Sequence, residues 1–108
     1  MSAALPGGWS SSWAAGDGIL TIEMATTPAA GGLTVDRVRV GPVLLDLELR
    51  RLRSTLRIRL RHRQGPSVTL CLRLPAPGPG LVEVDGVTLQ GNPVRFTFSG
   101  EHEVVAYY

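Results

Sequence analysis

The segment at residues 50–63, RRLRSTLRIRLRHR, carries seven arginines and a histidine and no acidic residue. Guanidinium groups bind phosphate and carboxylate oxygens in a bidentate geometry, so such a cluster could serve an anionic partner. From Leu56 to Leu60, however, aliphatic residues alternate strictly with Arg57 and Arg59. A period of two predicts a β-strand with its arginines on one face and its aliphatic side chains on the other.

The preceding segment supplies acids for that arginine face. Residues 43–50 alternate in the same way, with Asp46 and Glu48 opposite in phase to the aliphatic row. If 43–50 and 55–61 pair as a hairpin around residues 51–54, these acids lie opposite or diagonal to Arg57 and Arg59. The first interpretation is therefore a solvated sheet face in which arginines pair with acids and keep the strand edges soluble.

The second interpretation is an anion-binding surface at the two ends of this hairpin, where the acids of the neighbouring strand run out. The residues predicted for such a site are Arg50, Arg51, Arg53, Arg61 and Arg63. Nucleic acid is disfavoured as the anion, because nucleic-acid-binding sheets interleave aromatic with basic residues and the sequence predicts no aromatic residue on this face.

Aromatic side chains raise a third interpretation. Trp9, Trp13, Tyr107 and Tyr108 stand near the two ends of the chain, and flat aromatic rings on a β-sandwich can hold the pyranose rings of carbohydrates. The alternative is that the tryptophans pin the N-terminal segment against the sheet and that the tyrosines end the last strand. The sequence leaves both readings open.

The remaining candidate residues form no recognisable catalytic or metal-binding motif. His102 stands between Glu101 and Glu103, and adjacent side chains in an extended segment diverge, so this is not the spacing of metal ligands. There is no G-x-S-x-G nucleophile motif and no glycine-rich phosphate loop. The single cysteine, Cys71, has no partner for an internal disulfide. We therefore expect no catalytic residue, no metal and no cofactor.

The composition is that of a small folded domain. The chain has 108 residues, a hydrophobic fraction of 44% and a formal net charge of +2. This suits one domain with a single core, and the charge is too small to predict a polyanionic partner. No apolar run is long enough to cross a bilayer, and the first residues lack the features of a secretory signal. We therefore expect no membrane association and a cytoplasmic protein.

Short alternating segments separated by turn signals make up most of the sequence, and no stretch shows a helical period. About eight short strands predict a single antiparallel β-sandwich of jelly-roll or immunoglobulin-like type, with a barrel as the second choice. We expect the sandwich over residues 18–108. Residues 1–17, rich in glycine, serine and alanine, are expected to form an irregular lead-in.

Two local features are predicted from residue types. The alternation changes phase after Val35, which predicts a β-bulge at Asp36-Arg37. Asp85-Gly86 between two short apolar runs predicts a type I′ hairpin turn. Loops are predicted at TTPAAGG (26–32) and PAPGPG (75–80).

Three stretches of the sequence together resemble a known family. They are Pro6 to Trp9 in LPGGW, the run from Val40-Gly41 to Leu49, and Val82 to Gly86 in VEVDG. In this order they resemble the accessory C-terminal β-sandwich of helical-barrel glycoside hydrolases of the glucoamylase-like and debranching type. The resemblance implies a packing or stabilising module for a catalytic domain. The sequence contains no such catalytic domain, which leaves a gene fragment, a separated subunit or an unrelated stand-alone sandwich.

These observations predict a non-catalytic accessory or interaction module. Its expected partner is a catalytic domain or another protein, in a carbohydrate-active context if the resemblance holds. The first alternative is a carbohydrate-binding module that uses its aromatic residues. The second is an anion or nucleic-acid binder that uses the arginine face.

Overall fold

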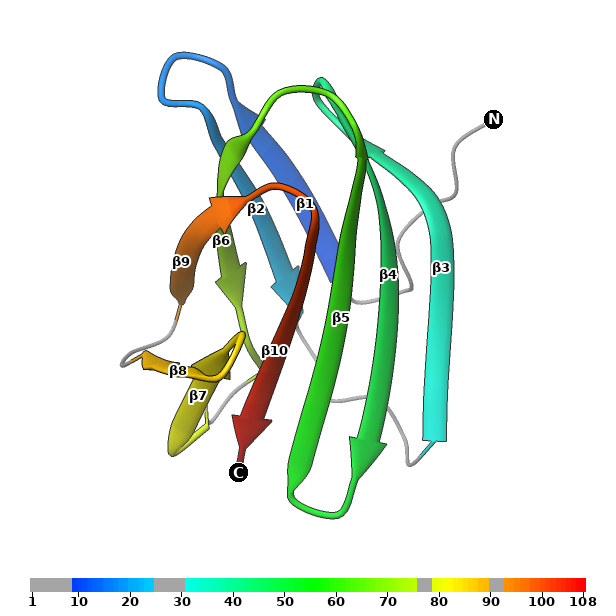
Figure 1. The fold of residues 1–108 in the computed structure, drawn as a ribbon, viewed down its shortest axis with the longest axis vertical. Coiled ribbons are helices and arrows are strands. Elements are labelled where there is room, and N and C mark those ends of the chain that lie inside the picture. The colour runs from blue at the N-terminus through cyan, green and yellow to red at the C-terminus, as the bar shows by residue number, and fades with distance from the viewer. Residues whose placement is uncertain (1–8, 25–30, 76–78, 90–92) are drawn as a thin grey trace.

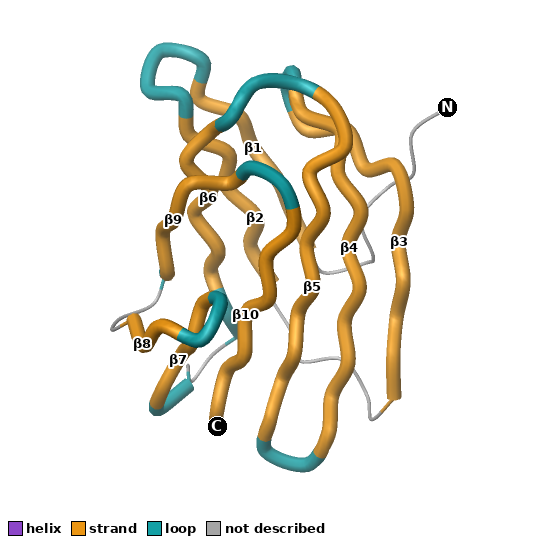
Figure 2. Tube along the Cα trace, viewed as in Figure 1, coloured by secondary structure: helices purple, strands orange, loops and turns teal. Residues whose placement is uncertain are grey.

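The computed structural model describes residues 9–24, 31–75, 79–89 and 93–108, and the regular structure of these residues is β-strand throughout (Figure 2). The strands are β1 (Trp9–Ala14), β2 (Ile19–Met24), β3 (Gly31–Val40), β4 (Val43–Leu52), β5 (Thr55–Gln64), β6 (Val68–Arg73), β7 (Leu81–Val84), β8 (Val87–Leu89), β9 (Val94–Phe98) and β10 (Glu101–Tyr107). The predicted all-β fold is confirmed, with ten strands where about eight were expected. Within the described ranges no helix could cross a membrane.

The strands form two sheets that pack face to face as a β-sandwich (Figure 1). The smaller sheet has the strand order β1-β2-β6-β9, and the larger has the order β3-β4-β5-β10-β7-β8. Three strands of the larger sheet, β3, β4 and β5, have 10 residues each, whereas the strands of the smaller sheet have at most 6. The larger sheet is therefore longer as well as wider than the sheet that covers it.

One strand pair departs from the expected antiparallel arrangement. β2 and β6 run parallel, with Leu20 opposite Leu70 and Ile22 opposite Leu72. A parallel pair needs a long connection, and the chain here passes through β3, β4 and β5 of the other sheet before it returns as β6. The other pairs between described strands are antiparallel.

The core consists of the aliphatic rows that the alternation predicts. Fully enclosed side chains include Leu45, Leu47, Leu49, Leu56, Ile58 and Leu60 from the larger sheet and Leu20, Ile22, Leu70, Leu72 and Phe98 from the smaller one. No described polar or charged side chain is buried with them. Burial of an unpaired charge in such a core would be costly, so the arginines of β5 must face outward.

The predicted bulge and hairpin turn are both confirmed. The β3–β4 register shifts between Val35 and Val38, and Arg37 in this bulge has a left-handed backbone with φ 57°. Asp85 and Gly86 both have positive φ, at 51° and 84°, and connect β7 to β8 as a type I′ turn requires.

The β4–β5 turn is tighter than expected. Strand pairing continues to Leu52 and Thr55, which leaves Arg53 and Ser54 as the whole connection in place of residues 51–54. Arg53 adopts φ 55° to make this two-residue turn. The shorter turn moves the register of the hairpin by two residues, and this decides which charges face one another on the outer surface.

The N-terminal segment differs from the irregular lead-in expected over residues 1–17. Residues 9–14 form β1, which pairs with β2 and places Trp13 opposite Leu20. Serine is not among the residues that are enriched in strands, so the run of serines in this segment did not indicate a strand. The strand is stabilised instead by its pairing with β2 and by the packing of Trp9 and Trp13 against the core. Residues 1–8, with Pro6 of the family resemblance, and most of the loop expected at 26–32 lie outside the described residues.

Trp13 also packs against the turn between β3 and β4. Gly41 in this turn has φ +56°, and a Cβ built on it would overlap Cγ of Trp13 and lie 2.7 Å from Cδ1. We therefore expect Gly41→Ala to lower the free energy of unfolding in urea by about 2–4 kcal/mol. Left-handed backbone strain and displacement of the indole ring both contribute to this loss.

Gly86→Ala is the matched control, because Gly86 also has a positive φ (+84°) but a Cβ there meets nothing within 4 Å. This variant should show the backbone strain alone, about 1 kcal/mol. If the two variants lose the same stability, the contact between Gly41 and Trp13 does not contribute.

Candidate functional site

The outer face of the larger sheet carries rows of charges that follow the strand register. Across β4, β5 and β10, one row is Glu48, Arg59 and Glu103, and the next is Asp46, Arg61 and Glu101. Nε of Arg59 lies 3.8 Å from Glu101, and its Nη2 lies 3.6 Å from Glu103. The predicted hairpin is confirmed, and Glu48 lies opposite Arg59. The predicted ion pairs of Asp46 and Glu48 with Arg57 and Arg59 are not formed, because Arg59 pairs with acids of β10, which is remote in the sequence.

Asp46 organises one end of this face. Its side chain is only 15% exposed, Oδ1 accepts the N–H of Arg37 at 2.8 Å, and Oδ2 lies 2.5 Å from Nε of Arg63. Partial burial raises the pKa of Asp46, but the hydrogen bonds from Arg37 and Arg63 and the charges of Arg63 and Arg61 outweigh it. The pKa therefore lies below its ordinary value. Arg63, predicted for an anion site, is already bound to an internal carboxylate.

The charge pairing fails toward the β4–β5 turn. Arg50 lies directly opposite Arg57, with Gly32 on one side of the pair and Val105 on the other. Arg50 reaches Glu48 of its own strand at 3.2 Å. Arg57, by contrast, pairs with no acid of the described residues. Two like charges thus face one another, an arrangement that is destabilising in isolation. Glu48 and Glu103 lie in the neighbouring row, and Glu83 lies beyond Val105 in the same row.

Beyond this row lies a row without charge. Leu52, Thr55, Tyr107 and Leu81 lie opposite one another across β4, β5, β10 and β7. Three of these side chains are large and exposed: Leu52 to 74%, Leu81 to 42% and Tyr107 to 39%. Apolar groups gathered on one surface are more typical of an interaction site than the same groups scattered singly.

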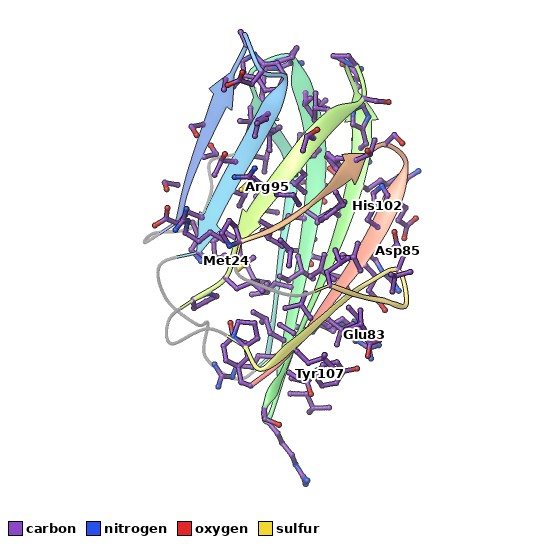
Figure 3. All side chains as sticks on the ribbon, turned by 90° about the vertical axis from the view of Figure 1, so that its left-hand side faces the viewer. Met24, Glu83, Asp85, Arg95, His102 and Tyr107 are labelled. Carbon is purple, nitrogen blue, oxygen red and sulfur yellow. The ribbon has the colours of Figure 1, made fainter. Side chains whose placement is uncertain are left out.

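We refer to these two rows, together with Arg51, which lies between them opposite Leu56, as the arginine–tyrosine surface. It is made of Arg50, Arg51, Leu52, Arg57, Leu81 and Tyr107. All but Leu81 line one depression of about 680 Å³, which Gly32 and Thr55 complete. Figure 3 shows Tyr107 and Glu83 along β10 and β7, toward the same end of the molecule as the β4–β5 turn. The surface can hold a carboxylate on its guanidinium groups and an apolar group against Tyr107 and Leu52.

The five arginines predicted for an anion site do not come together. Arg50 and Arg51 line the depression, and Arg53 lies in the adjacent turn. Arg61 and Arg63 lie toward the opposite end of β5, beside a separate depression of about 350 Å³. The sequence-based prediction also omitted Arg57. The turn length could have revealed it, because a two-residue turn at Arg53-Ser54 places Arg57 opposite Arg50.

The four aromatic residues predicted for a carbohydrate site do not share a face. Trp9, Trp13 and Tyr108 are partly buried and pack against the core. The hydroxyl of Tyr108 donates to the carbonyl of Pro75 at 3.4 Å, and burial raises its pKa while the nearby charge of Arg51 opposes the rise. Tyr107 alone lies on the outer face, because β10 pairs with β5. The expectation of an arginine face without aromatic residues was therefore wrong.

The two histidines lie on the adjacent strands β5 and β10, and both rings contact the ring of Phe98. The His62 and His102 ring centroids lie 5.2 Å and 5.8 Å from that of Phe98. Nε2 of His62 donates to the carbonyl of Pro66 at 2.9 Å. His62 is thus held at the turn after β5.

Both ring nitrogens of His102 are engaged in joining two turns. Nδ1 lies 2.6 Å from Oδ2 of Asp85, and Nε2 accepts the N–H of Ser99 at 3.2 Å (Figure 3). Partial burial raises the pKa of Asp85, but hydrogen bonds from the Glu103 N–H and from His102 outweigh it, so this pKa also lies below its ordinary value. The arrangement clamps the β7–β8 turn to the β9–β10 turn and leaves no ring nitrogen of His102 facing a substrate.

The other candidate chemical groups are dispersed. In the part of the chain that the structure describes, no three side chains of histidine, cysteine, aspartate or glutamate are placed to hold a metal ion. Cys71 is a buried free thiol in β6, between Thr21 and Arg95 of the neighbouring strands. The arginine–tyrosine surface is consequently the one candidate site that both charge and exposure single out in the described residues.

Comparisons with known proteins add no relative to this picture. Neither protein-family models nor curated proteins nor solved structures give a match to this chain.

Asp46→Asn tests how far the charge of Asp46 stabilises the sheet. The amide keeps an acceptor for the N–H of Arg37 and loses the ion pair with Arg63. A carboxyl group with a lowered folded-state pKa stabilises the fold above its unfolded-state pKa, near 3.8, and loses this contribution as the pH falls through the folded-state pKa. At neutral pH we expect the free energy of unfolding in urea to be about 1 kcal/mol higher for wild type than for the variant. This difference should shrink below about pH 4.

Asp17→Asn provides the control, since Asp17 is exposed and makes no side-chain ion pair with the described residues. Its unfolding curves should follow those of wild type at each pH. A difference between wild type and Asp46→Asn that persists unchanged into acid would assign the effect to the shape of the side chain and not to its charge.

Proposed function

We propose that this domain is a non-catalytic interaction module that binds an acidic segment of a partner protein through the arginine–tyrosine surface. The observation that carries the proposal is the pair Arg50 and Arg57, placed opposite each other beside a row of exposed apolar side chains. Like charges on facing residues oppose folding, and exposed Leu52 and Tyr107 contribute little to the core. Both features favour association with a partner that brings carboxylates and apolar groups.

The charges on the rest of the face support a protein partner over a nucleic acid. Asp46, Glu48, Glu101 and Glu103 share this face with the arginines, and they would repel a phosphate backbone that ran past the depression. An acidic polypeptide segment can be confined to the end at which Arg50 faces Arg57, beyond the row of Glu48 and Glu103. One aromatic residue, Tyr107, is also too few for the stacking platform on which single-stranded nucleic acids bind.

A catalytic domain is one partner of this kind, as the resemblance to accessory sandwich domains of glycoside hydrolases implies. In such a pair the sandwich would position and stabilise its partner, and the chemistry would lie in the partner. The arginine–tyrosine surface would then be the docking face, because it combines arginine and aromatic groups that contribute strongly at protein interfaces.

The proposal predicts that Arg57 contributes to binding and not to folding. The probe is a short fluorescent peptide of alternating glutamate and valine residues, and its anisotropy measures binding to the domain. Arg57→Gln should weaken binding by about tenfold, because a hydrogen bond to a charged group contributes about 1.5–3 kcal/mol. The thermal midpoint should stay the same or rise, because the repulsion between Arg57 and Arg50 is removed.

Arg95→Gln is the matched control, because Arg95 is an exposed arginine on β9 of the other sheet (Figure 3). It removes the same charge and should leave the affinity for the peptide nearly unchanged. If both variants lose the same affinity for the peptide, the effect is due to net charge alone, which would contradict the proposal. Tighter binding of random single-stranded DNA than of the peptide at the same salt concentration would also contradict it.

A further inference from the structure

The outer edge of β3 lies next to the arginine–tyrosine surface, because Gly32 of β3 lines the same depression. β3 is the first strand of the larger sheet, and no described strand pairs with its outer side (Figure 1). It has 10 residues, from Gly31 to Val40. An edge strand of this length presents unpaired N–H and C=O groups that another extended chain can join.

The first half of β3 lacks the usual devices that block such pairing. Charged side chains begin only at Asp36, and the bulge that interrupts the strand lies between Val35 and Val38. Residues 31–35, GGLTV, contain neither a charge nor a proline. Natural sheets protect their edges with lysine or other charges, proline and bulges. With respect to the described strands, this half of β3 is therefore an open edge, whereas the second half is protected.

The two faces beside this open edge differ in chemistry. On the inner face Leu33 is 36% exposed and Val35 is only partly buried, since the shorter sheet does not cover them completely. On the outer face Gly32 stands in one row with Arg50 and Arg57 and lines the same depression. A chain that lies along this edge therefore meets apolar groups on one side. On the other side it meets Arg50 next to Gly32 and, one row further along, Glu48 next to Thr34.

We propose that the acidic partner segment binds as an added β-strand on the first half of β3, with alternating apolar and acidic side chains. Its apolar residues cover Leu33 and Val35, and its carboxylates point toward Arg50 on the outer face. The inference rests on the proposed function and specifies its mode: main-chain hydrogen bonds to the edge of β3, combined with the charge of the arginine–tyrosine surface.

The spacing of the strands allows this contact. Neighbouring strands lie about 4.8 Å apart, so an added strand lies about 10 Å from β4, which carries Arg50. Gly32 places no side chain between an added strand and Arg50. A Cβ built there would lie 3.4 Å from the carbonyl oxygen of Leu49 and 3.7 Å from Cγ of Arg50, so the side chain of Arg50 borders this space. A glutamate side chain at the facing position can therefore meet the guanidinium of Arg50, with Arg57 adding to the positive potential behind it.

Peptides with methylated backbone amides test this mode of binding. In an extended glutamate–valine peptide, the N–H groups of all glutamates point to one edge and those of all valines to the other. One peptide carries N-methyl groups on its glutamates and the second carries them on its valines. Strand addition predicts that one of the two binds at least about tenfold more weakly than the unmodified peptide, whereas the other keeps its affinity.

The variant Gly32→Glu gives an independent measurement on the protein. It places a carboxylate of the chain itself beside Arg50, and it should weaken binding of the unmodified peptide at least as much as Arg57→Gln does. Gly32→Gln is the control of similar shape and should retain more affinity. Circular dichroism confirms that each variant is folded.

The outcomes separate this inference from the proposed function. If both methylated peptides bind alike while Arg57→Gln still weakens binding, strand addition is wrong and the arginine–tyrosine surface remains the site. If the methylated peptides differ but Arg57→Gln has no effect, the edge of β3 binds without help from that surface and the proposed function is wrong as stated. If neither the methylation pattern nor Arg57→Gln changes the affinity, both are wrong.

Discussion

The register of β5 between β4 and β10 is the constraint on which the rest of this structure depends. Leu56, Ile58 and Leu60 of β5 are fully buried, so a slip of one residue would turn Arg57 and Arg59 into the core. Burial of a guanidinium without a partner costs several kcal/mol, whereas each correct aliphatic residue contributes roughly 1.5–3 kcal/mol. Burial of the aliphatic residues thus fixes the arginines of β5 on the outer face, whatever charges lie next to them on that face.

What the arginines meet is decided by the β4–β5 turn. With Arg53 and Ser54 as the whole turn, Glu48 lies opposite Arg59 and Asp46 opposite Arg61, so two rows alternate in charge. The same register sets Arg50 against Arg57. A facing like-charge pair costs up to about 1 kcal/mol, which is small beside the core and does not alter the register. The repulsion between Arg50 and Arg57 is therefore confined to one end of the sheet, and these two residues form the charged part of the candidate site.

The features that were predictable from sequence are those with a local signal. The alternation of residues 43–49 and 56–60, the bulge at Arg37 and the Asp85-Gly86 turn follow from residue types a few positions apart, and the structure confirms each of them. Features that depend on remote pairing were missed. The parallel β2–β6 pair and the strand β1 belong to this group, because serine-rich or aliphatic segments do not specify which sheet they join.

The residues of the candidate site likewise divide into those with a local sequence signal and those that depend on remote strand pairing. Arg50 and Arg51 were predicted from the basic segment itself, but Arg57 required the length of a turn and Tyr107 required the pairing of β10 with β5. Leu81 entered because β7 pairs with the other side of β10. A surface assembled from four strands far apart in the sequence has no linear motif, so residue spacing could indicate its charge but not its apolar half.

The arrangement of the two halves of β3 bears on why the site lies where it does. The bulge at Arg37, tied to Asp46 by a 2.8 Å hydrogen bond, interrupts the edge beside the rows in which arginines and acids are paired. The regular half of β3 runs instead toward the row in which Arg50 faces Arg57, with Gly32 opposite Arg50 and Thr34 opposite Glu48. A bulge and a charge ladder together discourage edge pairing and association at one end. At the other end the strand has no bulge and Arg50 faces Arg57. An edge that no described strand pairs with, beside two facing arginines, favours an acidic extended segment over a second copy of this net-positive domain.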